Sequence, residues 1–598
     1  MPEDFLNYFE KELCFLREMG SDFAGKYPKV AGRLLLEPDK CEDPHTERLI
    51  EAFAFLCARI QRKIDDGLPE ITQSLLQVLY PHLSSPLPSV SVVRFNPLLK
   101  NVPGSGYHID QGTPLFSRPV DGMPCQFRTV YPMVLWPMEV VSAHVEEPRR
   151  LVKGAQQVVR IRLKLHGTSF SRFQGDSLRF FVNGQPQHAY PLYQLLLNNV
   201  CRIECTPAGA PEGALPLENG CLSPVGFAAG EGLFPYPEQS FPGYRLLLEY
   251  FAFPQKFLFF ELTGFSALGK GEFGDVIDLL LYLNEATPDR LVVGAQTFCL
   301  HATPVVNAFQ KTAEPIRHEH EKTEYRLLAD LRREEGTEVL SVDDVTATVS
   351  TSPLKVKKYR PVYSLEHYQH RDDVSEGNAY WHMQRRPSSL AHQCGTDVFL
   401  SFCGPGLDPA EPSEETVMVR VTCSNRDLPS QLPFCDPSGD FQIEAAAPVE
   451  TINCLIRPTR TLRPPLSGAQ QWRLISHLSL NHLSLIEGGR ASLKEMLALY
   501  DFGDSAATRQ QISGIVSVTS RHVTRRIGAA FCRGVEVTVE FDEDKYIGSS
   551  LYLFASVLER FLGQYVSVNS FVQLVARTAR DNRVLKKWPA RNGDRVLI

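Results

Sequence analysis

One short motif has the spacing of a dinucleotide-binding loop. Residues Gly269–Gly274, with the sequence GKGEFG, fit the pattern GxGxxG and follow the apolar segment Phe257–Leu262. In dinucleotide-binding folds a helix comes next, and its N-terminus holds the pyrophosphate. Here Asp275–Leu283 is a short apolar run typical of a buried strand, and Asp275 and Asp278 would repel phosphate. We therefore expect a loop between two strands and assign no cofactor and no cofactor-binding residue.

Four histidines raise the question of a metal site. His318 and His320 stand two apart between charged neighbours, and His367 and His370 follow. A His-x-His pair presents both rings on one side only in a strand, and ligand geometry needs supporting packing. The surrounding segment Arg317–Lys322 is charged throughout and is interpreted as solvated, so no metal ligand is assigned.

The 14 cysteines are scattered singly along the chain, many of them in apolar runs such as those around Cys14 and Cys299. Cys201 and Cys205 are four residues apart, but no second pair completes a zinc site, so we interpret both as core thiols. Unpaired thiols of this kind are typical of a reducing cytoplasm. The sequence contains no P-loop, GxSxG, HExxH or recognisable cysteine nucleophile, so we assign no catalytic residue and expect no enzyme.

Composition limits the remaining classes. The chain has 598 residues, 62 Lys and Arg against 69 Asp and Glu, and a net charge of −7, which offers no general attraction to nucleic acid. Its most basic stretch, Arg577–Lys587, is interpreted as a solvated tail. No apolar run reaches the roughly 18 residues of a membrane span, so direct membrane insertion is not expected. The N-terminus lacks the pattern of a secretory signal.

Helices are expected at the start of the chain. Apolar residues recur at helical spacing in two segments, and a third helix is predicted over Pro69–Tyr80, before a proline-rich stretch. The first apolar stripe consists of Phe5, Phe9, Leu13 and Leu16, and the second of Leu49, Phe53, Leu56, Ile60 and Ile64.

Strands are expected from Ser89 onward, because apolar and polar residues then alternate, as in Val159–His166. The apolar and aromatic run Tyr244–Leu262 is interpreted as two core strands interrupted by a proline. The middle of the chain suggests short strands joined by long loops. Near the end, a strand, a helix with an apolar stripe over Leu551–Tyr565 and a strand at Val566–Asn569 give a β-α-β order.

These patterns predict an α+β, multidomain fold: an N-terminal helical segment, then β-rich domains, then a mixed α/β C-terminal domain. The expected divisions are a helical region at 1–88, a β-rich domain at 89–306, a loop-rich mixed β domain at 307–450 and a C-terminal α/β domain at 451–598. Clustered aromatic residues and ordered loops are typical of proteins that present surface to partners.

Several blocks of the sequence resemble the TssF family (VasA or ImpG), a baseplate subunit of bacterial type VI secretion systems. The resemblance runs in order along the chain from Tyr8 to Ile598. Its most distinctive blocks are YFEKELCFLREMG from Tyr8, DPHTERLIEAFAFLCARIQRKIDD from Asp43, GYRLLLEYFAFPQKFLFF from Gly243, WRLISHLSLNHLSL from Trp472 and WPARNGDRVLI at the end.

The resemblance implies a structural scaffold. In this family two TssF copies join one TssG in a wedge with TssK and TssE, and six wedges surround the VgrG spike hub and template the Hcp tube and the contractile sheath. It also implies a cytoplasmic protein, in a baseplate docked through TssK at the inner face of the inner membrane. Alternatives are a wedge protein of another contractile injection machine or phage-like baseplate, and a nucleotide-dependent oxidoreductase.

We hypothesise that Phe5, Phe9, Leu13 and Leu16 contribute to a helical bundle with TssG and the second TssF copy. The alternative is that these four residues pack against Leu49–Ile64 in their own chain.

Overall fold

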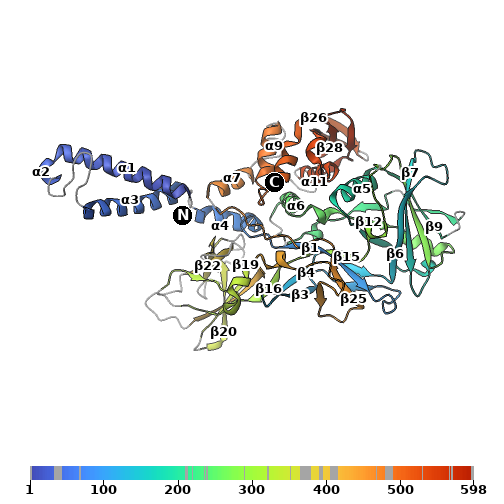
Figure 1. Ribbon diagram of the computed structural model, residues 1–598, viewed down its shortest axis with the longest axis horizontal. Helices are drawn as coiled ribbons and strands as arrows, with labels where there is room; N and C mark the ends of the chain where they lie inside the picture. The colour runs from blue at the N-terminus through green and yellow to red at the C-terminus, as the bar shows by residue number, and fades with distance from the viewer. Residues whose placement is uncertain are drawn as a thin grey trace. The chain divides into compact units, whose positions relative to one another are not determined.

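The computed structural model (Figure 1) has helices and strands throughout the chain. It describes residues 3–31, 44–65, 69–208, 213–218, 220–234, 236, 240–288, 290–318, 322–349, 352–363, 379–388, 395–404, 415–466, 468–478, 489–527, 530–564, 566 and 570–593. The chain divides into two compact units. The first comprises Met1–Val78 and Pro465–Leu478, and the second comprises Leu79–Pro464 and Ser479–Ile598.

The first unit is helical in the part that the structure describes. Its elements are α1 (Glu3–Lys26), the short α2 (Pro28–Ala31), α3 (Pro44–Asp65), α4 (Pro69–Leu79, whose last residue belongs to the second unit) and α7 (Gly468–Leu478). Helices α1 and α3 lie side by side as a long hairpin (Figure 1). Far along the chain, α7 returns to α4, where Thr72 Oγ1 donates a hydrogen bond to Gln471 Oε1 at 2.5 Å. The three expected N-terminal helices are confirmed.

A closed barrel lies at the centre of the second unit's topology. Its strand order is β1 (Val90–Pro97), β15 (Ala302–Val306), β4 (Met123–Thr129), β3 (Pro114–Val120), β24 (Phe441–Ile443) and β25 (Val449–Cys454). Buried apolar side chains such as Phe95, Phe127 and Phe441 fill it. The barrel therefore joins segments more than 300 residues apart, since β1 pairs with β25.

Two further sheets come from residues between β4 and β15. One is five-stranded, in the order β10 (Leu215–Pro216), β9 (Val200–Pro207), β13 (Val276–Leu283), β7 (Gln157–Leu165) and β6 (Met138–Glu146). The other is four-stranded, in the order β11 (Leu222–Pro224), β12 (Phe259–Thr263), β8 (Ser177–Val182) and β14 (Phe298–Cys299). The alternation predicted for Val159–His166 is confirmed, since β7 buries Val159, Ile161, Leu163 and Leu165 and leaves the residues between them half-exposed. Helices α5 (Pro186–Asn198) and α6 (Pro242–Ala252) and the two-stranded sheet of β2 (Tyr107–Ile109) and β5 (Met133–Leu135) complete this region.

The middle of the chain forms an eight-stranded sheet. The order is β16 (Phe309–Thr312), β23 (Glu415–Ser424), β19 (Glu338–Val349), β20 (Ser352–Pro361), β21 (Tyr380–Pro387), β22 (Thr396–Cys403) and β18 (Tyr325–Arg326), with β17 (Ile316–Arg317) also on β23. The prediction of short strands is wrong here, because β19 has 12 residues and β23 has 10. In β19, three acidic residues interrupt the apolar alternation.

The last part of the chain contains the predicted β-α-β order. The sheet order is β26 (Ile515–Ile527), β27 (Ala530–Phe541), β28 (Ser570–Thr578) and β29 (Val584–Lys587), with β30 (Arg591–Asn592) also on β28. Helix α11 (Leu551–Gly563) joins β27 to β28, which run parallel. Helices α9 (Gly489–Ala498) and α10 (Ala506–Ser513) precede β26. The second strand of this β-α-β unit, β28, begins at Ser570 and not at Val566 as expected. Residues 567–569 of the expected strand lie outside the described residues, as does Tyr565 of the expected helix.

Two sequence interpretations are corrected by these elements. The run Tyr244–Leu262 supplies one strand rather than two, because its first part belongs to α6. Pro242 occupies the first turn of α6, and the helix is buried on nearly all sides, so its sequence shows no polar face that would separate it from a strand. The basic stretch Arg577–Lys587 is not a solvated tail, because it contains the end of β28 and all of β29.

Buried charged and polar groups connect parts of the second unit. Lys256 and Glu249 form a fully buried ion pair, and Glu249 also accepts a hydrogen bond from the Leu233 N–H at 2.7 Å. Burial lowers the pKa of Lys256 to about 8. His301 is buried beside the barrel and accepts a hydrogen bond from the Trp136 N–H, and burial lowers its pKa to about 3.

Candidate interaction surface

The hairpin of α1 and α3 holds together through a narrow set of contacts. The ring of Phe5 meets the ring of Phe55 edge-on, with centroids 5.1 Å apart, and Phe5 is buried. Ala54 and Ala58 of α3 are completely buried, and their small side chains allow a close approach. Arg17 donates to Glu47 through Nε at 3.2 Å, in a solvent-exposed pair that adds little stability.

The opposite face of α3 is apolar and open to solvent. Leu49, Phe53, Leu56 and Ile60 are 71 %, 56 %, 52 % and 60 % exposed. Their spacing of four, three and four residues places them in one stripe, about 150° around the helix from the buried alanines. This stripe is called the outer stripe below. Contiguous exposed apolar residues of this size mark protein interaction sites in soluble proteins.

Helix α1 adds a second exposed series. Phe15, Met19 and Phe23 recur every four residues and are 56 %, 53 % and 39 % exposed. The hairpin therefore presents apolar side chains from both helices, more than contacts within the hairpin can cover.

The four residues predicted for the interface lie on α1. Phe5 packs within its own chain, in line with the alternative, whereas Phe9, Leu13 and Leu16 are half-buried. Their contact with a partner stays a prediction. The sequence pattern placed the outer stripe on one helix face but left open whether that face packs against α1 or whether α1 packs against a partner. The residues that α3 buries are two alanines, which a search for large apolar side chains passes over.

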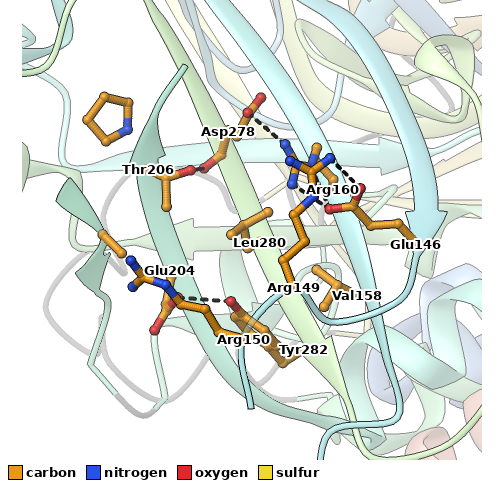
Figure 2. Close-up of a pocket in the computed structure, with 12 residues that line it drawn as sticks. Glu146, Arg149, Arg150, Val158, Arg160, Glu204, Thr206, Asp278, Leu280 and Tyr282 are labelled. Atoms are coloured by element: carbon orange, nitrogen blue, oxygen red, sulfur yellow. Dashed lines mark hydrogen bonds and ion pairs between the residues drawn. The ribbon is translucent and has the colours of Figure 1, made fainter. Parts of the chain in front are cut away.

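A polar pocket in the second unit is the other candidate site. It has a volume of about 90 Å³ and opens on the sheet of β6, β7, β9 and β13 (Figure 2). The Asp278 carboxylate accepts two hydrogen bonds from Arg162, at 2.8 and 3.0 Å, and one from Arg160 at 3.1 Å. Arg160 Nε also donates to Glu146 at 2.8 Å.

The charges in this pocket neutralise one another. Glu204 accepts a hydrogen bond from the Tyr282 hydroxyl at 3.0 Å, and burial together with this bond raises the pKa of Tyr282 to about 12. Arg202 pairs with the same carboxylate at 2.6 Å. Each carboxylate thus pairs with an arginine. Asp278 and Glu146 pair with arginines of the neighbouring strand β7, and Glu204 pairs with Arg202 of its own strand, β9. This network ties β6, β7, β9 and β13 together, and its carboxylates are occupied by structural contacts.

The predicted loop at Gly269–Gly274 is confirmed. A short 3-10 helix (Phe265–Lys270) begins before it, and β13 follows directly, so no helix starts where a pyrophosphate would bind. A side chain at position 271 would contact the Phe273 ring at 2.7 Å, which gives this glycine a packing role.

The histidine and cysteine candidates are dispersed. His318 is buried, not solvated as expected, with its ring 5.3 Å from that of Phe402; His320, His367 and His370 lie outside the described residues. Cys205 is buried as expected, but Cys201 is exposed, so its interpretation as a core thiol is wrong; Cys14, in its apolar run, is exposed as well. Among the described residues, no group of three or more His, Cys, Asp or Glu side chains could hold a metal.

In the described part of the chain, no helix combines the length and the apolar character needed to cross a bilayer.

Comparisons with known proteins agree with one another. The protein-family model for the type VI secretion system protein TssF matches residues 1–595. The chain is 34 % identical over 629 aligned positions to the type VI secretion system component TssF1 of Pseudomonas aeruginosa, with all of both chains covered.

Solved structures give the same result. One similar chain belongs to the TssK-TssF-TssG baseplate subcomplex of a type VI secretion system; it matches with a TM-score of 0.73 and 27 % identity, covering 92 % of this chain and 99 % of that one. A second belongs to the baseplate complex of a type VI secretion system, with a TM-score of 0.61 and 26 % identity over 99 % of this chain and 100 % of that one.

An α+β, multidomain fold that matches baseplate structures over nearly its whole length defines a structural component of a secretion baseplate. More narrowly, the chain belongs to the TssF family of bacterial type VI secretion systems.

Proposed function

We propose that this chain is a wedge subunit of the type VI baseplate, with two copies joined to one TssG and with TssK and TssE attached. Six such wedges surround the VgrG spike hub and template assembly of the Hcp tube and the contractile sheath. The similar chain in a TssK-TssF-TssG subcomplex supports TssK and TssG as partners. In this proposal the protein is a scaffold and catalyses no reaction.

The helical hairpin is proposed as the joint of the wedge. The outer stripe on α3 and the half-buried Phe9, Leu13 and Leu16 on α1 enter a helical bundle with TssG and with the hairpin of the second copy. The stripe's heptad-like spacing fits knobs-into-holes packing between helices. A bundle buries the apolar area that the hairpin leaves open and can still rearrange as rigid helices when the sheath contracts.

The proposed location is the cytoplasm, at the inner face of the inner membrane. TssK, rather than this chain, provides the link to the membrane complex. The scattered free thiols fit a reducing compartment.

The observation that carries the proposal is the exposed outer stripe, with Leu49 at 71 % and Ile60 at 60 % exposure. The test is co-expression of the tagged chain with its cognate TssG, followed by affinity capture and native mass spectrometry. We expect a complex of two copies with one TssG. A chain that folds but elutes without TssG would contradict the proposal.

A further inference from the structure

The last sheet of the second unit has an open edge. In the order β26-β27-β28-β29, strand β26 is the end member, with β27 on one side only. Helix α9 covers the start of β26, where Arg490 donates to the Val516 carbonyl at 3.3 Å; its Lys494 donates to the carbonyl of Ser513, the last residue of α10, at 2.8 Å. Beyond that point, among the described residues, the backbone of Ser517–Arg525 bonds only to β27. Alternate N–H and C=O groups of this segment therefore face outward without a strand to pair with.

The same edge carries an excess of positive charge. Residues 521–536 include four arginines and a single glutamate. Glu536 on β27 is held by three cations: Lys587 Nζ at 2.6 Å, Arg521 Nη2 at 2.9 Å and Arg525 Nη2 at 3.8 Å. These contacts lower the pKa of Glu536, so the carboxylate stays ionised and cancels only one of the three charges. Another acid, Glu540, lies toward the covered end, where it accepts a hydrogen bond from Ser517 at 2.7 Å.

The charges remain available to a partner. Arg521, Lys587 and Arg525 have side chains that are 72 %, 44 % and 37 % exposed, whereas Glu536 is only 10 % exposed. The sheet thus presents cations at its surface and keeps the balancing carboxylate beneath them.

We propose that β26 is a docking edge that accepts an extended, acidic segment of a partner protein as one more strand of this sheet. Outward backbone groups of Ser517–Arg525 supply the hydrogen-bond ladder, and Arg521 and Arg525 select glutamate or aspartate at alternating positions of the incoming strand. A peptide fits better than a nucleic acid because an extended peptide backbone offers alternating N–H and C=O groups at the repeat of the edge strand. The surface is separate from the helical hairpin, and the inference stands apart from the proposed bundle.

Charged residues on an edge strand can also serve only to prevent association. The two roles differ in what they do to an acidic strand: a guarding edge excludes it, whereas a docking edge binds it.

The test uses the full chain and a fluorescently labelled ten-residue peptide in which glutamate alternates with valine. Two control peptides accompany it: one has lysine in place of glutamate, and one has the same glutamates with proline in place of valine, which removes the amides needed for pairing. We expect saturable binding of the first peptide only, together with slower amide hydrogen exchange in Ser517–Arg525.

The variant R521Q/R525Q is expected to weaken binding by about tenfold or more, because two of the cations are lost. The matched control R509Q/R580Q removes two exposed arginines from the same part of the chain and is expected to change affinity less than about twofold. Lack of binding by the acidic peptide, equal binding of its proline version, or displacement of the peptide by a single-stranded oligonucleotide at lower concentration would each overturn the proposal.

Discussion

Removing two side chains of the outer stripe is expected to break the wedge without unfolding the chain. The change is Phe53→Ala together with Leu56→Ala, at positions that are 56 % and 52 % exposed. Aromatic side chains bury roughly 150–250 Å² when fully covered, so Phe53 has on the order of 100 Å² still available for a partner. With Leu56, truncation removes roughly 150 Å² of apolar contact, worth about 3–4 kcal/mol at ~25 cal/mol per Å².

That free energy corresponds to a loss of roughly 10²- to 10³-fold in affinity for TssG. The stability of the chain alone should change by less than about 0.5 kcal/mol, since both positions are exposed and alanine favours helix. The assay is titration of purified chain with TssG by biolayer interferometry, with thermal unfolding as the check of folding. Arg48→Ala with Arg59→Ala, two exposed positions on the same helix, is the matched control. If the apolar double variant binds TssG as tightly as the arginine control, the outer stripe is no interface.

Three further predictions concern the second unit. Lys256→Met should destabilise the fold by about 3–5 kcal/mol in chemical denaturation, because the buried Glu249 loses its nearer cation and keeps only Arg245 at 4.0 Å, and adding Glu249→Gln, which can still accept from the Leu233 N–H, should restore part of the loss. Lowering the pH from about 6.5 toward 3 should reduce the free energy of unfolding, because His301 stays neutral in the folded chain (pKa about 3) but binds a proton in the unfolded chain. In the variant His301→Gln, the free energy of unfolding should depend less steeply on pH over this range, by up to about 1.4 kcal/mol per pH unit. Gly534→Ala should lower the melting temperature strongly, since its methyl group would lie 2.4 Å from a backbone oxygen of β28, whereas Gly230→Ala, with open space around it, should not.

The sequence predicted elements whose apolar period is clear. The alternation in Val159–His166 and in β27 corresponds to buried residues at every second position over most of each segment, so period and structure agree. Where burial is nearly complete, as in α6, polar residues no longer mark a face, and helix and strand become indistinguishable by pattern. Local patterns also do not predict which distant strands pair: nothing in the sequence of Val449–Cys454 indicates that this strand pairs with β1.

The candidate surface shows the same limit at the level of side chains. Spacing placed Leu49, Phe53, Leu56 and Ile60 on one face of a helix, and the structure agrees. Which face turns toward α1 was decided by size rather than hydrophobicity, because Ala54 and Ala58 let the helices approach closely while the larger residues remain outside. The three expected boundaries at residues 88, 306 and 450 stay predictions, although the barrel combines strands from three of the segments they define.

Hydrogen exchange of α3 in the presence and absence of TssG is the most direct measurement of the central claim, that the exposed hairpin face becomes a buried joint. We predict that the amides of Pro44–Ile60 exchange at least about tenfold more slowly in the complex, because the bundle stabilises a helix that is now supported on one side only. A complex that forms while α3 exchanges as fast as in the free chain would contradict the claim.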